Sequence, residues 1–238
     1  MIFTWNLNMN HKNSSSTESQ LLKIFLRANN KDYFSQEIKT GEEIFSFKKP
    51  QQNIYYSLQG IVKLSRIDCA GRETFVGLLP EKSFIGLSLL LNKSELRYRA
   101  VALTPTISIS TTPTQFKQKL AESPQLWTPI FQQALSRSLV AQMIVESRLR
   151  RTSEARLVAF LLVLCQDFGI ETDKGMRIEL KLTHKILADW THINRPCITK
   201  TIGQLQKKHI ISVERQQITL HNPSVLRQYF DIPAYSSC

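Results

Sequence analysis

Residues 182–206 carry the pattern that most restricts how this chain can fold. Apolar residues recur there at spacings of four and three positions, at Ile198, Ile202 and Leu205. Because this period places all three on one side of an α-helix, it indicates a helix with one buried stripe. A second short helix precedes it, and the pair predicts a helix-turn-helix.

Burial of this stripe leaves Arg195, Thr199 and Lys200 of the second helix, which we expect to face outward. An α-helix fits the major groove of B-DNA, and arginine pairs well with guanine O6 and N7. The formal net charge of +12 also favours a polyanionic partner, nucleic acid first and an anionic membrane second. The helix pair therefore suggests a DNA-binding function.

Composition and motifs exclude several other classes of protein. The four cysteines are scattered without a C-x-x-C pair, so neither a disulfide framework nor a zinc site is expected. No H-E-x-x-H, G-x-S-x-G or P-loop motif is present, so we expect no metal site and no enzyme. The longest apolar run, residues 157–165, is too short to span a bilayer, and no secretory signal is evident. We expect a soluble intracellular protein.

The N-terminal half predicts a small antiparallel barrel or roll. Residues 1–16 are polar and predict a disordered tail, after which a short helix begins at Thr17 or Ser19. Short strands then alternate with turns as far as residue 110, and the segments 61–67 and 73–79 form a hairpin candidate.

Helical patterns follow residue 112. A short helix is expected over residues 113–121, and a long one from Pro124 to about Arg151. Six positions of the long helix recur at coiled-coil spacing: Phe131, Leu135, Ser138, Gln142, Val145 and Leu149. The pattern is compatible with an ordinary core helix, but the length of the helix favours a dimer helix whose polar middle sets register or contacts a ligand.

The C-terminal pattern predicts a winged helix, with a helix at 153–168 ended by Gly169 and a strand at 177–181. The helix pair and a hairpin within residues 210–220 follow. The predicted fold class is therefore α+β, with a β-roll, a long dimerisation helix and a winged helix-turn-helix. The expected domains are a tail (1–16), the roll (17–121), the dimer helix (122–151) and the DNA-binding domain (152–238).

This order resembles the Crp/Fnr family of bacterial transcription regulators, from about residue 20 to 225. The likeness is carried by residues 84–90, 97–104, 156–169 and 182–184, and within the family it points to the NtcA-type global nitrogen regulators of cyanobacteria and their plastid-encoded relatives in red algae. The resemblance implies a homodimeric activator that binds a pseudo-palindromic promoter site and contacts RNA polymerase.

The resemblance also makes the roll an effector-sensing domain. Cyclic AMP is not expected, because no Glu lies within the segment 84–88 and Tyr98 replaces a small hydroxyl residue after Arg97. The implied effector is 2-oxoglutarate, whose carboxylates an arginine can bind in bidentate fashion. Gln142 stands where the family has an acidic residue, and Arg97 and Arg137 could instead be solvated or paired with Glu95 or Glu146. The candidate effector-binding residues are Phe84, Ile85, Gly86, Leu87, Arg97, Arg137 and Gln142.

On the DNA side the resemblance makes Arg195 the first base-reading residue, and Lys200 replaces a second arginine. Pro196 cannot offer the acceptor that some relatives have there, and Thr199 and Thr201 are expected to donate to backbone or base edges. The full set of DNA-binding candidates is Arg195, Lys200, Thr199, Thr183, His184, Asn194 as the N-cap, and Pro196.

Two alternatives stay open. His192 occupies a turn position where a glycine with positive φ is usual, and Pro196 is also unusual at its position. The first alternative is therefore a ligand-sensing dimer with weakened or lost DNA binding. A regulator with another small-molecule effector is the second. Few glycines and many Lys, Asn and Ile residues suggest an AT-rich genome, so the plastid (chloroplast) stroma is expected, with a bacterial cytoplasm as the alternative.

Overall fold

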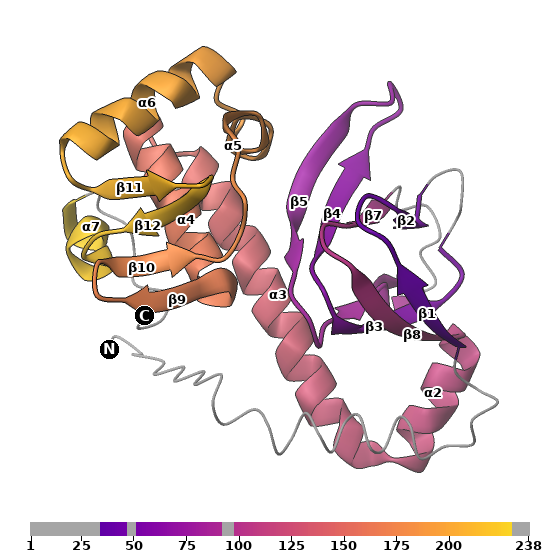
Figure 1. Ribbon diagram of the computed structural model, residues 1–238. Helices are drawn as coiled ribbons and strands as arrows, with labels where there is room; N and C mark the ends of the chain where they lie inside the picture. The colour runs from indigo at the N-terminus through magenta and orange to yellow at the C-terminus, as the bar shows by residue number, and fades with distance from the viewer. Residues whose placement is uncertain (1–33, 47–50, 92–97, 230–238) are drawn as a thin grey trace. The chain divides into compact units, whose positions relative to one another are not determined.

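A computed structural model describes residues 34–46, 51–91 and 98–229 of the chain (Figure 1). The expected tail and the short helix after Thr17 lie outside these residues. The chain divides into two compact units, Asn10–Leu139 and Val140–Cys238 together with Met1–Met9. Each unit is described by itself.

The first unit contains two antiparallel four-stranded sheets, as the roll prediction required. One sheet has the strand order β1-β8-β3-β6 and the other β2-β7-β4-β5. The predicted hairpin is present as β4 and β5, which pair from Val62↔Leu79 to Ile67↔Glu73. The strands are β1 (Phe34–Ile38), β2 (Glu43–Phe45), β3 (Ile54–Gln59), β4 (Val62–Ile67), β5 (Glu73–Leu79), β6 (Phe84–Ile85), β7 (Tyr98–Ala102) and β8 (Thr106–Thr111).

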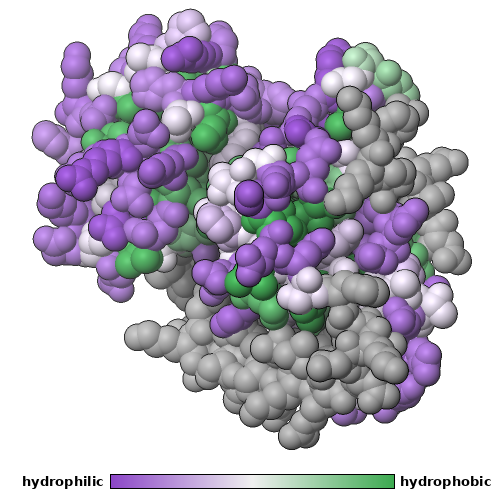
Figure 2. All heavy atoms as spheres, turned by 45° about the vertical axis from the view of Figure 1, so that its right-hand side comes forward, coloured by the Kyte–Doolittle hydropathy of each residue, from purple (hydrophilic) through white to green (hydrophobic). Residues whose placement is uncertain are grey.

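Two apolar clusters stabilise this unit. One joins the two sheets through residues such as Ile44, Tyr55 and Val62, and the other packs the β1-β8-β3-β6 sheet against helices through Phe84 and Phe116. The covering helices are η1 (Leu87–Leu91), α2 (Pro113–Glu122) and η2 (Pro124–Leu126). Figure 2 shows hydrophilic side chains over much of the visible surface, interrupted by small apolar patches.

The long helix α3 spans Trp127–Arg148. The prediction placed its start at Pro124, but residues Pro124–Leu126 form a 3₁₀ turn instead. All six residues of the predicted seam are exposed to solvent, including Phe131 (61%) and Leu149 (77%). The interpretation of α3 as an ordinary core helix is therefore wrong for this face, because a core helix would bury it. None of the described helices is long and apolar enough to cross a membrane.

The second unit is built around α4 (Ser153–Phe168), whose bounds agree with the prediction. Its N-cap Thr152 accepts a hydrogen bond from the Ala155 amide, and ten of its residues are buried. Gly169 ends the helix in an extended conformation (φ −84°, ψ 133°), so it begins a strand instead of forming a left-handed cap. The remaining elements are β9 (Gly169–Thr172), β10 (Gly175–Ile178), α5 (His184–Thr191), α6 (Arg195–Lys207), β11 (Ile211–Glu214), β12 (Gln217–Leu220) and α7 (Pro223–Tyr229).

The sheet of the second unit has the order β11-β12-β10-β9. Strand β10 was expected at 177–181 and lies slightly earlier, while its partner β9 was not predicted. The hairpin β11–β12 is confirmed, and its register runs from Ile211↔Leu220 to Glu214↔Gln217. Together with α5 and α6 this sheet completes a winged helix-turn-helix, so the predicted α+β fold class is confirmed (Figure 1).

The turn between α5 and α6 has the conformation that the sequence suggested. His192 adopts φ 56° and ψ 32°, the left-handed region that strains a residue with a Cβ. Partial burial lowers the pKa of its imidazole below 6.5, and the positive charge of Arg148 lowers it further, against a smaller opposite effect of Asp189. The neutral ring is thus favoured in the folded protein.

An ion-pair network joins all four strands of the β2-β7-β4-β5 sheet. Arg99 binds Glu43 on one side (Nε–Oε1, 2.6 Å) and Glu73 on the other (Nη1–Oε2, 2.7 Å). Lys63 Nζ and Ser65 Oγ both donate to Glu73 Oε1 at 2.6 Å. Partial burial raises the pKa of Glu73, but these hydrogen bonds and the Lys63 charge outweigh it and bring the pKa from 4.5 to about 2.

Replacing Glu73 should reveal this network as a pH-dependent stability difference. The folded-state pKa is depressed, so the stabilisation is complete above about pH 4.5 and is lost as the pH falls towards 2. We expect Glu73→Gln to lower the free energy of unfolding at neutral pH by up to about 1 kcal/mol. Urea unfolding followed by circular dichroism measures it, and exposed Glu81→Gln is the control. A difference that does not change with pH would contradict the assignment.

His192→Gly should stabilise the protein by about 1 kcal/mol, because glycine adopts the left-handed conformation without strain. His192→Ala removes the ring but keeps the Cβ, so it should show no such gain. Since the folded-state pKa of His192 lies below 6.5, the unfolded chain takes up the proton first and wild-type stability falls below that pH. The gain from glycine should therefore be larger at about pH 5.5 than at about pH 8 in thermal unfolding.

Candidate nucleic-acid interface

The orientation of α6 is set by its buried stripe. Ile198, Ile202 and Leu205 are at most 4% exposed and face the interior of the second unit. Arg195, Thr199 and Lys200 are exposed, as predicted. Lys200 lies opposite the buried stripe, and Arg195 and Thr199 lie along its edge. Thr201 is only 2% exposed, so the expectation that it contacts DNA is wrong. It belongs to the buried face of the helix.

Two of the candidates cap the helices. The Asn194 side chain accepts from the Cys197 amide (Oδ1···N, 2.9 Å), and Pro196 occupies the first turn of α6, where it leaves no hydrogen bond unmade. Thr183 Oγ1 accepts from the Ile186 amide at 3.1 Å and so caps α5. Because its acceptor is used in the cap, the Thr183 hydroxyl proton remains available to an external acceptor.

His184 and Thr199 connect the two helices. His184 Nδ1 lies 2.9 Å from Thr199 Oγ1, and Thr199 Oγ1 donates to the Arg195 carbonyl oxygen at 3.1 Å. In the part of the chain that the structure describes, no hydrogen bond or ion pair holds the Arg195 guanidinium or the Lys200 ammonium group. Both cations are thus available on the exposed surface.

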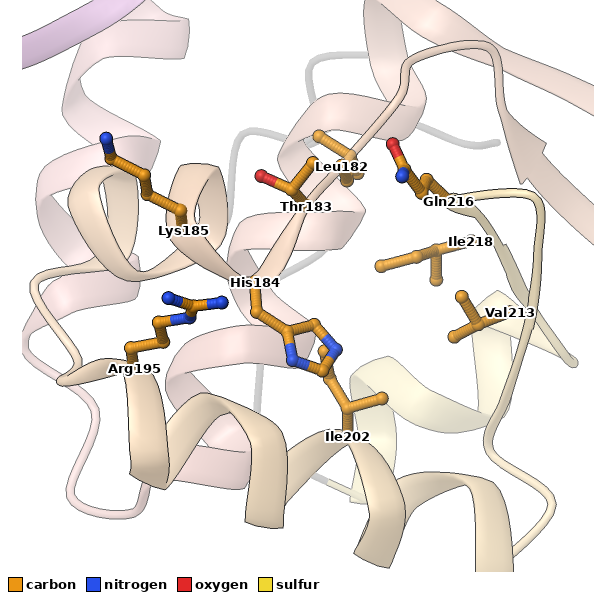
Figure 3. Close-up of a pocket in the computed structure, with 9 residues that line it drawn as sticks. All are labelled: Leu182, Thr183, His184, Lys185, Arg195, Ile202, Val213, Gln216 and Ile218. Atoms are coloured by element: carbon orange, nitrogen blue, oxygen red, sulfur yellow. The ribbon is translucent and has the colours of Figure 1, made fainter.

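A pocket of about 300 Å³ opens between α5, α6 and the wing (Figure 3). Its apolar residues come from the segment before α5, the sheet and the buried side of α6. Its polar residues come from the start of both helices and the wing tip. The lining residues are Leu182, Thr183, His184, Lys185, Arg195, Ile202, Val213, Gln216 and Ile218. Three of the predicted DNA-binding residues, Thr183, His184 and Arg195, therefore meet at one place.

Sequence reasoning missed Lys185, Arg215 and Gln216 at this surface. Lys185 follows His184 on α5, and the two wing-tip residues form the turn between β11 and β12. The turn is held against the start of α5, because the Leu182 amide donates to the Gln216 carbonyl oxygen at 2.7 Å. A basic residue in a two-residue hairpin turn was the available signal.

Arg148, in the last turn of α3, is bonded to the helix-turn-helix. Its Nε and Nη2 atoms donate to the Trp190 carbonyl oxygen at 3.3 and 3.1 Å. Burial lowers the pKa of the Arg148 guanidinium from its usual value. The bonds satisfy a carbonyl at the C-terminal end of α5, where a cation is also favoured by the helix dipole.

The effector candidates on the roll differ in their surroundings. Phe84 and Ile85 are buried core residues at 7% and 1% exposure, so their side chains are not open to a ligand. The Phe84 amide already donates to Gln133 Oε1 at 2.7 Å. Gly86 has φ +91°, and a Cβ there would overlap the Gln51 side chain, which explains the glycine. Leu87 begins η1 and is half-buried.

The other effector candidates come from α3 and from outside the described residues. Arg137 is half-buried, and its Nε atom is buried. It lies one helical turn after Gln133. The Nε2 atom of Gln133 donates to the Lys82 carbonyl oxygen at 2.7 Å. The face of α3 that bears Arg137 therefore points towards residues 82–85. Gln142 is exposed, and it falls in the second compact unit. Arg97 lies outside the described residues.

Metal ligation finds no support in the geometry. Among residues 34–46, 51–91 and 98–229, no group of three or more His, Cys, Asp or Glu side chains is placed to hold an ion. The described side chains at both candidate sites offer hydrogen-bonding groups and positive charges. Such groups bind phosphates, base edges and carboxylates.

Two family models match the chain. Residues 155–229 match the Crp-like helix-turn-helix domain, and residues 35–123 match the cyclic nucleotide-binding domain. Solved structures agree on the fold. A CRP-family transcriptional regulator from Thermus thermophilus gives a TM-score of 0.68 at 16% identity, covering 85% of this chain and 100% of its own. The global regulator CLP of Xanthomonas campestris gives 0.70 at 17%, covering 86% and 99%.

Curated relatives are more informative about the subgroup. The global nitrogen regulator of Nostoc sp. is 38% identical over 197 residues, which cover 82% of this chain and 88% of the relative. That of Synechocystis sp. is 39% identical over 192 residues, or 80% and 85%. A putative HTH-type transcriptional regulator, ycf28 of Porphyra purpurea, is 33% identical over 93 residues, 39% of each chain. These relatives are regulators, not enzymes. The chain belongs to the Crp/Fnr family of transcription regulators, in which it is similar to the cyanobacterial global nitrogen regulators.

Proposed function

We propose that this chain is a homodimeric, sequence-specific activator of nitrogen-responsive genes that senses 2-oxoglutarate. Its roll (17–121) senses the effector, α3 and its flanks (122–151) form the dimer, and the winged helix (152–238) reads promoter DNA. The observation that carries the proposal is the exposed Arg195 guanidinium in the first turn of α6, beside the opening of the pocket between α5, α6 and the wing.

The DNA contacts divide into two kinds. Arg195 and Lys200 on α6 read base edges in the major groove, where an arginine recognises guanine. Thr183 and His184, at the start of α5, contact phosphates, and so position the helix. Lys185 and the wing tip extend the phosphate contacts. The left-handed turn at His192 is compatible with this arrangement, which argues against the alternative of a sensor that no longer binds DNA.

Dimerisation accounts for the exposed apolar stripe of α3. Trp127, Phe131, Leu135, Leu139, Val145 and Leu149 are each at least 44% exposed. Such a stripe on one helix is unfavourable in water and matches the seam of a two-helix coiled coil. Two copies related by a twofold axis present two recognition helices, and this symmetry implies a pseudo-palindromic operator.

The effector proposal rests on Arg137 and on the backbone of Ile85–Leu87. A dicarboxylate needs a cation or amide donors at each end, and the α3 face that bears Arg137 points towards this segment. A different small-molecule effector is the alternative, since Gln142 replaces the acidic residue of the family. RNA polymerase as a partner and activation instead of repression follow from the family alone.

The proposed location is the plastid stroma, with a bacterial cytoplasm as the alternative. The chain has only eight glycines, and its composition suggests an AT-rich genome. Its relatives include cyanobacterial regulators and ycf28 of Porphyra purpurea.

Arg195→Ala tests the base-reading role. On an operator selected from random duplexes by the wild type, we expect a loss of about 1–3 kcal/mol, or roughly 5- to 150-fold in Kd, with relaxed preference at one position. Lys207→Ala, at the exposed end of α6, serves as the control and should weaken all sequences alike. If the wild type binds operator and scrambled duplex equally at moderate salt, the sensor without DNA recognition is the correct alternative.

Leu135→Glu tests the dimer. A charge buried at the seam would be unpaired, so we expect the variant to sediment as a monomer and to lose operator binding. Gln132→Glu adds the same charge at an exposed position about 60° around the helix from Leu135, outside the six seam positions, and should remain dimeric. A monomeric wild type at micromolar concentration would contradict the proposal.

Isothermal titration calorimetry tests the effector. We expect heat with 2-oxoglutarate and none with cyclic AMP, and Arg137→Ala should weaken 2-oxoglutarate binding by about 10-fold or more, the usual range for a charged hydrogen bond. Exposed Lys117→Ala on α2 is the control for loss of a positive charge. Heat with cyclic AMP alone would overturn the assignment.

A further inference from the structure

We propose that His184 is a specificity-determining positioning residue, which makes Thr199 a hydrogen-bond acceptor towards DNA and so selects an amino-bearing base. The inference rests on the proposed DNA-binding function. It is carried by two short contacts of the Thr199 hydroxyl, one with His184 Nδ1 at 2.9 Å and one with the Arg195 carbonyl oxygen at 3.1 Å.

A threonine hydroxyl has one proton and two lone pairs. If His184 carries its proton on Nδ1, the ring donates to Thr199 and the hydroxyl proton goes to the Arg195 carbonyl oxygen. If Nδ1 is unprotonated, the hydroxyl proton goes to Nδ1 instead. In the first arrangement both contacts are hydrogen bonds, whereas in the second only the contact with Nδ1 is one. In either case the hydroxyl proton is used within the protein and only a lone pair remains for DNA.

The Thr199 side chain is placed where a base edge would lie. It is exposed and sits one helical turn after Arg195, about 100° around α6 from the buried Ile198. Figure 3 shows His184 reaching from α5 towards α6, beside Arg195 and Ile202. The histidine thus contacts Thr199 through Nδ1, while Thr199 itself stays exposed.

The position of His184 is itself fixed by its neighbours. Thr183 caps α5 through the Ile186 amide at 3.1 Å, and the Leu182 amide is bonded to the wing at Gln216 at 2.7 Å. The first turn of α5 is therefore attached both to its own helix and to the hairpin. A histidine on this turn is held in place better than one on a free loop, so it can fix the Thr199 rotamer.

This restriction changes what the helix can distinguish. A free threonine hydroxyl can donate or accept, so it pairs with any base edge. An acceptor pairs with the amino groups of adenine N6 and cytosine N4, and is repelled by guanine O6 and thymine O4. Arg195 and Lys200 are cationic donors and favour guanine. Thr199 lies within one turn of both and, as an acceptor, favours adenine or cytosine instead. We therefore expect one position of each half-site to prefer adenine or cytosine on the strand that α6 contacts.

The experiment measures base preference position by position. An operator is selected with the wild-type protein, and all four base pairs at each half-site position are compared by competition binding. The wild type should prefer adenine or cytosine at one position by roughly 2- to 12-fold, the ratio expected of one ordinary hydrogen bond. Thr199→Val, which has the same shape without the hydroxyl, should abolish that preference, whereas Thr199→Ser should retain it.

His184→Phe keeps an aromatic ring but removes the bond to Thr199. We expect it to reduce the preference at the Thr199-dependent position alone and to show no further loss when combined with Thr199→Val. The ratio between bases distinguishes this role from a phosphate contact or a folding defect, since either of those weakens all sequences equally.

The outcomes separate the inference from the function on which it depends. If the wild type selects no operator, both fail. If it selects an operator whose Arg195-dependent position is clear, but no amino preference responds to Thr199→Val, only the inference is overturned. If Thr199→Val abolishes the preference and His184→Phe leaves it unchanged, the positioning role of His184 is wrong.

Discussion

The burial of three apolar side chains under α6 determines which residues of this helix face outward, where DNA would bind. Ile198, Ile202 and Leu205 are almost fully removed from water, and each such side chain contributes about 1.5–3 kcal/mol. A rotation of α6 that exposed them would cost several kcal/mol. A polar contact on the outer face is worth about 1 kcal/mol. The apolar stripe therefore decides that Arg195, Thr199 and Lys200 face outward, and no surface interaction can reverse it.

Polar residues at this surface serve the fold and the interface together. Asn194 and Thr183 each use a side-chain oxygen to cap a helix, and Thr199 uses its proton within the protein. Only the donor and acceptor positions that are not used in these internal hydrogen bonds remain available to DNA. Recognition thus depends on internal bonds as well as on which residues are exposed.

The helix α3 is bonded near both of its ends to segments that bear proposed site residues. In the first unit Gln133 bonds to the Lys82 carbonyl and the Phe84 amide, close to the proposed effector segment. In the second unit Arg148 bonds to the Trp190 carbonyl at the end of α5. We infer that a ligand that shifts the population of α3 conformations would act on both attachments, which gives the proposed effector a physical route to the helix-turn-helix.

Much of the fold was predictable because its signals are local. The bounds of α4, the β4–β5 and β11–β12 hairpins, the helix pair and the left-handed turn at His192 all follow from caps, periodicity and turn positions within a few residues. The exposed apolar positions of α3 were also recognisable, since their spacing follows the helical period. Of the candidate site, the exposed residues of α6 could be inferred from the same helical period.

What only the tertiary structure decided depends on contacts between distant residues. Periodicity could not show that Phe84 and Ile85 are core residues, that Thr201 is buried, or that β9 pairs with β10. The same holds for the bonds of Gln133, Arg148 and His184, whose partners lie 49, 42 and 15 residues away. The amino-acid order determined the local geometry and the outward face of the recognition helix, because propensity and amphipathicity act over one or two turns. Side-chain partners were set by how the elements pack, since a hydrogen bond forms only where packing brings its two atoms together.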